Sequence, residues 1–405
     1  MAMQSVRLRN AFKGDRVIWA LVAVFMFYSL LAVYSSSASV AYLKFGGNNT
    51  YFLRSQSLML FMSLIIIVIV HYLPYRIYSR LSGIILLGSI ALLVLTFLIG
   101  ARVNEAVRTI EIPGTGFRLQ TSDVAKVALV IYLARALSQF NDELGNFMIV
   151  TKYMMLPIAV VCGLIMPENL STALMVFLIS MIILFIGRVP LRFLLAYAGI
   201  AVAGVVLFAM VLSMVSEKNR VEVWKTRIER YFSEDTNDEA DYQSNQAKIA
   251  ISTGGLFGKA PGKSTQRNIL PQSNSDFIFA IIIEEYGLLF GAIPLILAYM
   301  ILLFRGILIV RKCETAFPAY LVMGLVVMIT VQAMLNMFVA VGLFPVTGQT
   351  LPMVSWGRTS VLVVSFSIGA ILSVSRVVNA RIRQEELPEE EKTDEGDRIY
   401  GPAKA

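Results

Sequence analysis

Stretches of about twenty apolar residues recur along the chain, and each ends at charged or turn-forming residues. A helix of that length crosses a hydrocarbon core roughly 30 Å thick. The pattern therefore predicts an all-α polytopic membrane protein with about ten transmembrane helices and one large extracytoplasmic loop. The predicted helices are residues 16–37, 52–73, 81–100, 123–138, 149–166, 170–187, 190–215, 276–304, 317–341 and 359–380. The fourth is short and carries Lys126 and Arg135, so we expect it to be partly shielded from lipid.

The composition agrees with a membrane protein, because 57% of the 405 residues are hydrophobic and only 15% are charged, against about 25% in a soluble domain. The net charge of +8 is attributed to basic cytoplasmic loops rather than to a nucleic-acid partner, since Lys and Arg flank the apolar stretches instead of forming one stripe. Cys162 lies in an apolar stretch and Cys313 follows a basic pair, and neither pattern indicates a disulfide, a zinc site or a nucleophile.

Lys and Arg are more frequent at one set of helix ends than at the other, which favours both termini in the cytoplasm. The basic start of the chain imitates a signal peptide, but the many later spans favour an uncleaved first helix. The chain then divides into a cytoplasmic tail (1–15), seven transmembrane helices (16–215), the extracytoplasmic loop (216–275), three further helices (276–380) and a disordered cytoplasmic tail (381–405).

The extracytoplasmic loop has two parts of different composition. Residues 217–231 carry charges around Val221, Trp224 and Ile228, which is typical of an amphipathic helix on the membrane surface or of a solvated helix packed on the bundle. The remainder is rich in Gly, Ser, Asn and Gln and is predicted to be irregular.

Several common catalytic arrangements are excluded by the residues that the chain holds. His71 is the sole histidine and stands at the predicted cytoplasmic end of the second helix, where an interfacial ring is the favoured interpretation, so Ser-His triads and His-rich metal sites are excluded. The segment with Gly258, Gly262, Lys263 and Ser264 approximates a P-loop, but its glycines are one residue too close and no strand precedes them. We therefore do not expect ATP use.

The carboxylates near the predicted outer face are better candidates for chemistry. Asp276 stands where the loop ends and an apolar helix begins, so it is either a helix cap or a general base at the water–lipid boundary. Glu284 and Glu285 follow roughly 12 Å further along that helix. They either pair with Lys126 or a neighbouring cation, or line a substrate cavity.

Cations gather on the same predicted side. Arg102, Arg108 and Arg118 lie between the third and fourth helices, and Asp123 precedes Lys126 by one turn. The loop opposite carries Lys259, Lys263 and Arg267. These side chains are interpreted either as receivers for a pyrophosphate or as anchors that face lipid headgroups.

Five blocks of sequence stand in an order that carries a family resemblance. Residues 270–280 read Leu-Pro-Gln-Ser-Asn-Ser-Asp-Phe-Ile-Phe-Ala and continue into Glu284-Glu285-Tyr286-Gly287. The second block, residues 242–267, has a Gln-Ser pair, several glycines, and then Ser264 and Arg267. The third block runs from Asn104 to Ile110 and includes Arg108, and the fourth reads Gln-Thr-Ser-Asp-Val-Ala-Lys at 120–126. The fifth block, residues 336–360, contains Gly-Leu-Phe-Pro-Val-Thr-Gly. Together they resemble the SEDS family of cell-wall glycosyltransferases over nearly all of the membrane region.

The chain departs from the family pattern at a few positions. Thr109 replaces Trp, Glu168-Asn169 replaces Asp-Leu, Arg267 replaces Lys, Gln272 replaces Glu, and Arg358-Thr359 replaces Gly-Ser. Most replacements keep charge or hydrogen-bonding capacity. Because Gln272 lacks a carboxylate, Asp276 is left as the expected catalytic group.

The resemblance implies polymerisation of lipid II, a disaccharide-pentapeptide on undecaprenyl pyrophosphate, at the outer side of the bacterial cytoplasmic membrane. Asp276 would deprotonate the acceptor sugar hydroxyl, and cations would stabilise the departing pyrophosphate. The implied substrate-binding residues are Arg108, Lys126, Lys259, Ser264 and Arg267, and the cavity-lining or structural residues are Asp123, Gln243, Glu284, Glu285, Asn336, Thr347 and Ser355. No cofactor is evident, and a divalent cation that assists the pyrophosphate is left open.

The implied partners are the lipid II substrate, a class B penicillin-binding protein that supplies transpeptidation, cell-division proteins and membrane lipids, with no nucleic acid. Overall similarity favours a septal role in division over a role in elongation. Two other functions stay open: a lipid II flippase, which needs polar residues across both leaflets, and a scaffold that recruits a transpeptidase without catalysis.

Overall fold

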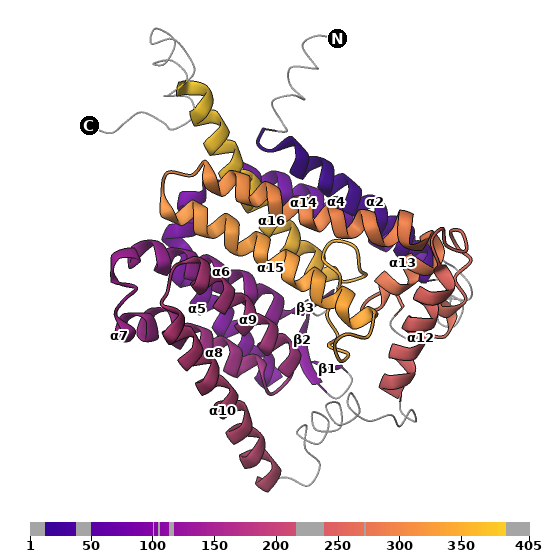
Figure 1. Cartoon of the computed structure of the whole chain (residues 1–405), viewed down its shortest axis with the longest axis horizontal. Helices are drawn as coiled ribbons and strands as arrows, with labels where there is room; N and C mark the ends of the chain where they lie inside the picture. The colour runs from indigo at the N-terminus through magenta and orange to yellow at the C-terminus, as the bar shows by residue number, and fades with distance from the viewer. Residues whose placement is uncertain are drawn as a thin grey trace.

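The computed structural model describes residues 13–37, 50–99, 101–103, 106–112, 117–215, 239–270 and 273–385. The main helices are α2 (Arg16–Ser36), α4 (Thr50–Tyr72), α5 (Tyr75–Ile99), α6 (Thr121–Gln139), α8 (Leu156–Ile165), α9 (Leu170–Ile186), α10 (Leu191–Val215), α12 (Glu239–Gly254), α13 (Ile278–Gly287), α14 (Ile293–Arg311), α15 (Ala316–Ala340) and α16 (Arg358–Glu385). The short helix α7 (Phe147–Val150) continues through a π turn (Thr151–Met155) into α8. Figure 1 shows these helices as one bundle, with α10 extending away from it.

All ten predicted segments coincide with helices, so the helical membrane fold is confirmed. Seven helical segments within the described residues are long and apolar enough to cross a membrane, and two shorter apolar helices, α9 and most of α10, accompany them. The helix α6 is not among either set, and most of its side chains are buried, as expected for a shielded helix. The number of membrane crossings therefore stays a prediction.

Several helix boundaries differ from the prediction, and α14, for example, continues to Arg311 rather than ending at residue 304. The third helix begins at Tyr75 rather than at residue 81, because Pro74 precedes its first turn and Arg76 and Arg80 point to solvent. The last helix continues to Glu385 rather than ending at 380, and Arg381 pairs there with Glu314 and with Glu385. Residues 386–405 of the predicted tail lie outside the described residues.

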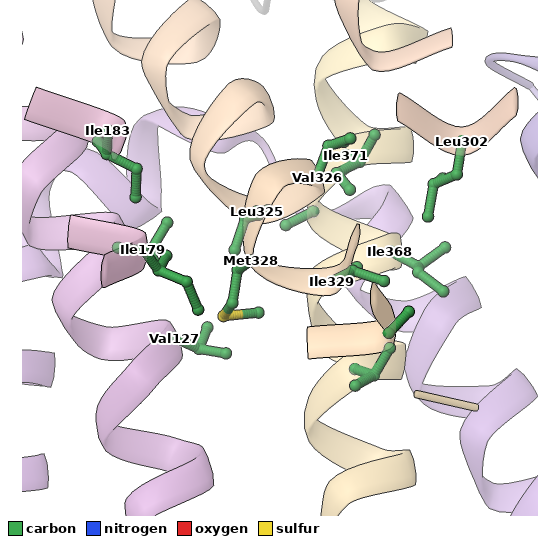
Figure 2. Close-up of a cluster of buried hydrophobic side chains, with 14 of the residues drawn as sticks. Val127, Ile179, Ile183, Leu302, Leu325, Val326, Met328, Ile329, Ile368 and Ile371 are labelled. Atoms are coloured by element: carbon green, nitrogen blue, oxygen red, sulfur yellow. The ribbon is translucent and has the colours of Figure 1, made fainter. Parts of the chain in front are cut away.

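The helix α15 forms the centre of the bundle. In the most apolar stretch of α15, 72% of the residues are buried, against 28–39% in α2, α4 and α5 nearer the N-terminus. One side of α15 presents Leu325 and Met328 toward α6 and α9, where Figure 2 shows Val127, Ile179 and Ile183. Its other side presents Val326 and Ile329 toward α14 and α16, where Leu302, Ile368 and Ile371 lie. Close packing on both sides makes α15 a rigid support for the polar residues that it carries.

A small antiparallel sheet, which the all-α prediction missed, lies between α5 and α6. Its strands are β1 (Ala101–Val103), β2 (Ala106–Ile112) and β3 (Phe117–Gln120), in that order. Strand β3 leads directly into α6, and the Thr359 hydroxyl at the start of α16 donates to the Arg118 carbonyl at 2.6 Å. The sheet is therefore fixed to the same end of the bundle as the start of α16.

The predicted span 276–304 is not one continuous helix. Gly287, at φ +72°, ends α13. The π turn and α14 that follow have 5 and 19 residues, which together rise about 36 Å, enough to cross a membrane alone. The Asp276 turn just before α13 contacts Asn336 near the end of α15, and the other end of α13 contacts Ser35 near the end of α2. In the predicted topology both contacts lie at the outer face, which predicts that α13 runs along that face.

The prediction that the second part of the loop is irregular is wrong for Glu239–Gly254, which forms α12, and is confirmed for residues 255–270, which hold only turns and one 3₁₀ turn. Its apolar positions Ala247, Ala250 and Ile251 fall on one helix face and pack on Phe277 and Ile281 of the α13 region. This short stripe was hidden among polar residues. The predicted amphipathic helix at 217–231 lies outside the described residues.

Candidate functional site

Asp276 lies two residues before α13, in the turn formed by residues 273–277. Phe277, not Asp276, is the N-cap residue of α13, so the simple interpretation of Asp276 as the helix cap does not apply. The carboxylate is half-buried, and its Oδ1 accepts a hydrogen bond from the Ser275 hydroxyl at 2.6 Å. Its Oδ2 faces Gly348, where a Cβ atom would stand 3.6 Å away.

The backbone around Asp276 is held by three hydrogen bonds from other segments. The Asn336 side-chain amide donates to the Asp276 carbonyl at 2.8 Å. The Ser355 hydroxyl donates to the Ser275 carbonyl at 2.7 Å, and the Trp356 N–H donates to the Asn274 carbonyl at 2.8 Å. The carboxylate therefore projects from a turn whose position is set by α15 and by the loop that precedes α16.

A buried polar track on α15 connects this turn with the predicted cations. Gln332 lies one turn before Asn336, accepts from Lys126 Nζ at 2.9 Å and donates to the Thr350 carbonyl at 3.1 Å. Lys126 also pairs with Asp123 at 2.8 Å, and the side chains of this ion pair are 4% and 6% exposed. A buried charge of this kind requires a partner, and the pair supplies it.

Asn336 extends the track to the far side of the loop. Its amide donates to the Gln349 carbonyl at 2.7 Å, and the Gln349 side chain donates to the Thr172 hydroxyl at 2.7 Å. The Asn336 Oδ1 and the Thr347 Oγ1 atoms are buried and have no hydrogen-bond partner within the described residues.

A second cluster is centred on Glu284 and Glu285. Glu284 pairs with Lys259 at 2.7 Å and accepts from the Ser264 hydroxyl and from the Thr265 N–H at 3.1 Å. Glu285 accepts from the Ser35 hydroxyl, and one of its oxygens lies 3.9 Å from Arg267. Of the two predicted types of partner, the neighbouring cations are observed and Lys126 is not.

The two clusters stand at opposite ends of α13. Asp276 and Glu284 are eight residues apart, which corresponds to about 12 Å along a helix. The Glu284 cluster binds the loop to α13 through backbone contacts as well, because the Lys259 N–H donates to the Glu284 carbonyl at 2.9 Å. Three predicted substrate-binding residues, Lys259, Ser264 and Arg267, therefore lie in the Glu284 cluster and not beside Asp276.

Other predicted site residues take different positions. Arg108 lies on β2, and neither its side chain nor Gln272 belongs to the described part of the chain. Gln243 is half-buried on α12. Among the described residues, no three His, Cys, Asp or Glu side chains gather closely enough to hold a metal ion.

The family-like block 120–126 and the departing pair Glu168-Asn169 meet at an open groove near the predicted outer ends of α5, α6 and α8, which spans about 390 Å³ including the solvent space at its mouth. Its polar lining comes from Thr96, Gln120, Thr121, Ser122, Glu168 and Asn169. The groove borders the start of α9, where Thr172 receives the hydrogen bond from Gln349. The groove and the Asp276 turn are thus joined by one hydrogen-bonded chain.

Sequence reasoning missed Gln332, Gln349 and Thr172. The signal for Gln332 was present, because an uncharged polar residue interrupts a long apolar stretch at 317–341. Gln349 and Thr172 gave no comparable signal, since each lies in a polar break that reads as an ordinary turn.

Comparison with known proteins places these features in context. A model of the family that comprises FtsW, RodA and SpoVE, described as "Cell cycle protein", matches residues 15–380. The chain is 30% identical over 388 residues to a "Probable peptidoglycan glycosyltransferase FtsW" of Halomonas elongata, covering 93% of this chain and 94% of the relative. It is 28% identical over 363 residues to a protein of the same name from Bacillus subtilis, covering 87% and 88% of the two chains.

Solved structures show the same fold. A chain of a peptidoglycan synthase complex, studied for its coordination of polymerization and crosslinking, matches with a TM-score of 0.68 at 22% identity, over 90% of this chain and 98% of that one. The rod shape determining protein RodA of Thermus thermophilus matches with a TM-score of 0.63 at 24% identity, over 90% and 97% of the two chains. The helical arrangement is therefore shared with both.

Proposed function

The chain belongs to the cell cycle protein family of FtsW, RodA and SpoVE, and on that premise we propose that it polymerises lipid II into glycan strands at the outer face of the cytoplasmic membrane. The relatives named above are peptidoglycan glycosyltransferases. The observation that carries the proposal is the half-buried Asp276 carboxylate, projecting from a turn that three hydrogen bonds hold. A fixed carboxylate with restricted solvation suits a general base.

In the proposed reaction Asp276 accepts the proton of the acceptor sugar hydroxyl. The acceptor oxygen then forms the new bond to the anomeric carbon of the donor. The bond from that carbon to the pyrophosphate oxygen breaks, and undecaprenyl pyrophosphate departs with the electron pair. A pyrophosphate leaving group needs neutralisation of its charge more than it needs a proton.

We assign that neutralisation to Arg108 and Arg267. Lys126, which was also expected to bind the substrate, is buried and forms an ion pair with Asp123 that carries no net charge, so its role is to hold the polar track. Arg267 is 20% exposed, so an incoming anion can reach its guanidinium in the Glu284 cluster. Arg108 lies on β2, in the sheet joined to the start of α16.

The test incubates the purified protein with lipid II in detergent, with and without its transpeptidase, and compares Asp276→Asn and Asp276→Ala with the wild type. Asp142→Asn is the matched control, because Asp142 is exposed in the turn after α6. Polymer from the wild type and the control, and none from the Asp276 variants, supports the proposal. Unchanged polymerisation by Asp276→Asn removes Asp276 from the mechanism, and transfer of lipid across vesicles with no polymer from any form supports a flippase instead.

We further propose a class B penicillin-binding protein as partner, a septal role in division and cytoplasmic termini. The match to a chain of a peptidoglycan synthase complex supports the partner, and the FtsW name of the relatives supports the septal role. Contacts such as Thr96 with Thr121 at one face and Arg376 with Tyr72 at the other agree with helices that alternate in direction. Fluorescent fusions that mark the side wall rather than the septum would contradict the septal role.

A further inference from the structure

A pocket at the end of the bundle opposite Asp276 has no part in the proposed reaction. It is open, spans about 370 Å³ including the solvent space at its mouth, and lies where the start of α2 meets the last turns of α14 and the C-terminal part of α16. Its lining residues are Asp15, Arg305, Leu308, Ile309, Lys312, Ser375, Val378 and Asn379. In the proposed orientation this pocket lies at the headgroup level of the cytoplasmic leaflet.

The only acid in the lining is already neutralised. Asp15 caps α2 through its Oδ1, which accepts from the Val17 N–H at 2.9 Å. Its Oδ2 accepts from two nitrogens of Arg305, with Nε at 2.8 Å. Among the described residues this leaves Lys312, which is exposed, as the charge of the lining that no acid balances, and the pocket therefore favours an anion.

Ser375 gives a separate indication of a ligand. It is 1% exposed, and its Oγ has no hydrogen-bond partner within the described residues. Other serines of the same helix donate to the preceding turn, as Ser365 does to Val361 at 2.7 Å and Ser367 does to Val363 at 3.0 Å. A buried hydroxyl without a partner costs about 1–3 kcal/mol unless a ligand or water satisfies it.

We propose that this pocket binds the phosphate group of an anionic membrane phospholipid. Lys312 would supply charge, and the Ser375 hydroxyl and the Asn379 amide would donate hydrogen bonds to the phosphate oxygens. The apolar side chains of Leu308, Ile309 and Val378 line the same pocket and suit the glycerol and upper acyl region of a lipid better than a free phosphate. The bound lipid would join α2, α14 and α16 at this end of the bundle.

The experiment titrates the purified full-length protein in neutral detergent with phosphatidylglycerol, phosphatidylcholine or inorganic phosphate. The melting temperature and the number of lipids retained in native mass spectrometry are both measured. We expect phosphatidylglycerol to raise the melting temperature more than either of the other two probes. Lys312→Gln should weaken phosphatidylglycerol binding about fivefold, the effect of one basic residue near a membrane surface.

Two matched controls separate the pocket from general surface charge. The control for Lys312→Gln is Arg311→Gln, which removes a positive charge at the adjacent exposed position outside the pocket. The control for Ser375→Ala is Ser367→Ala, which removes a hydroxyl that already has a hydrogen-bond partner. Both controls should keep wild-type binding, and Ser375→Ala should weaken it. Equal losses for Lys312→Gln and Arg311→Gln, or equal effects of phosphatidylglycerol and phosphatidylcholine, would overturn the proposal. Stabilisation by inorganic phosphate as strong as by phosphatidylglycerol would overturn the lipid assignment.

Discussion

The hydrogen bonds of Asn336 predict a large effect for a residue that does not enter the proposed chemistry. Asn336 is 1% exposed, and its amide donates to the carbonyls of Asp276 and Gln349. In Asn336→Ala both carbonyls lose their hydrogen-bond donor. The loss destabilises the fold by about 1–3 kcal/mol at the buried Gln349 carbonyl, and by less at the part-buried Asp276 carbonyl. Removal of the unpartnered Oδ1 returns about 1 kcal/mol, so the net loss of stability is about 1–3 kcal/mol.

The same change should reduce polymerisation beyond the loss of folded protein. Without the Asn336 tether the Asp276 turn can shift, and a displacement of about 1 Å at a catalytic group costs up to about 100-fold in rate. Asn336→Asp keeps the side-chain shape but replaces the donating amide with an acceptor, so it should fail similarly. Asn141→Ala, at an exposed position after α6, is the control.

The assay for Asn336 combines thermal unfolding in detergent with the rate of lipid II polymerisation per folded molecule. We expect both Asn336 variants to melt several degrees below the wild type and to polymerise at least about tenfold more slowly. If Asn336→Ala melts and polymerises like the wild type, the tether has no role in holding Asp276. If Asn336→Asp alone stays active, the effect of Asn336→Ala comes from lost volume rather than from lost hydrogen bonds.

Three further predictions follow from other contacts. Gly258→Ala should prevent stable folding of the loop, because Gly258 has φ +80° and an added Cβ atom would stand 2.3 Å from the Glu285 carbonyl oxygen. Gly255→Ala should lower the melting temperature less, because Gly255 has φ +56° and no atom lies within 4 Å of its added Cβ. Lys126→Met should destabilise the folded protein by about 3–5 kcal/mol, because it leaves Asp123 buried and unpaired. The double variant Lys126→Met with Asp123→Asn should melt at a higher temperature than Lys126→Met alone, and a double variant that melts no higher would refute the ion-pair argument. Burial raises the pKa of the Cys313 thiol to about 11. Since only the thiolate reacts with maleimide, labelling of a Cys162→Ala variant should be slow at pH 8, and its rate should rise about tenfold per pH unit up to pH 9.5. Rapid labelling at pH 7 would contradict the raised pKa.

Much of the architecture follows from the periodicity of apolar residues alone. A stretch such as 317–341 has few polar residues, and lipid or protein is the only environment that accepts such a helix without cost. The position of Asp276 at the junction of a polar loop and an apolar helix was similarly readable, as was the shielding of the helix that carries Lys126. These features are local, because each depends on the character of residues close in the chain.

The partners of the charged residues were decided by the tertiary structure. The sequence alone allows Glu284 to pair with any of several cations. The path of the loop around Gly287 brings Lys259 to Glu284, and Lys126 contacts Asp123 and Gln332 instead. The end of α13 also depends on that single break, since apolar composition continues through it unchanged. Contacts between residues far apart in the chain depend on how helices pack against one another, and a sequence pattern records which faces are apolar without recording which faces meet.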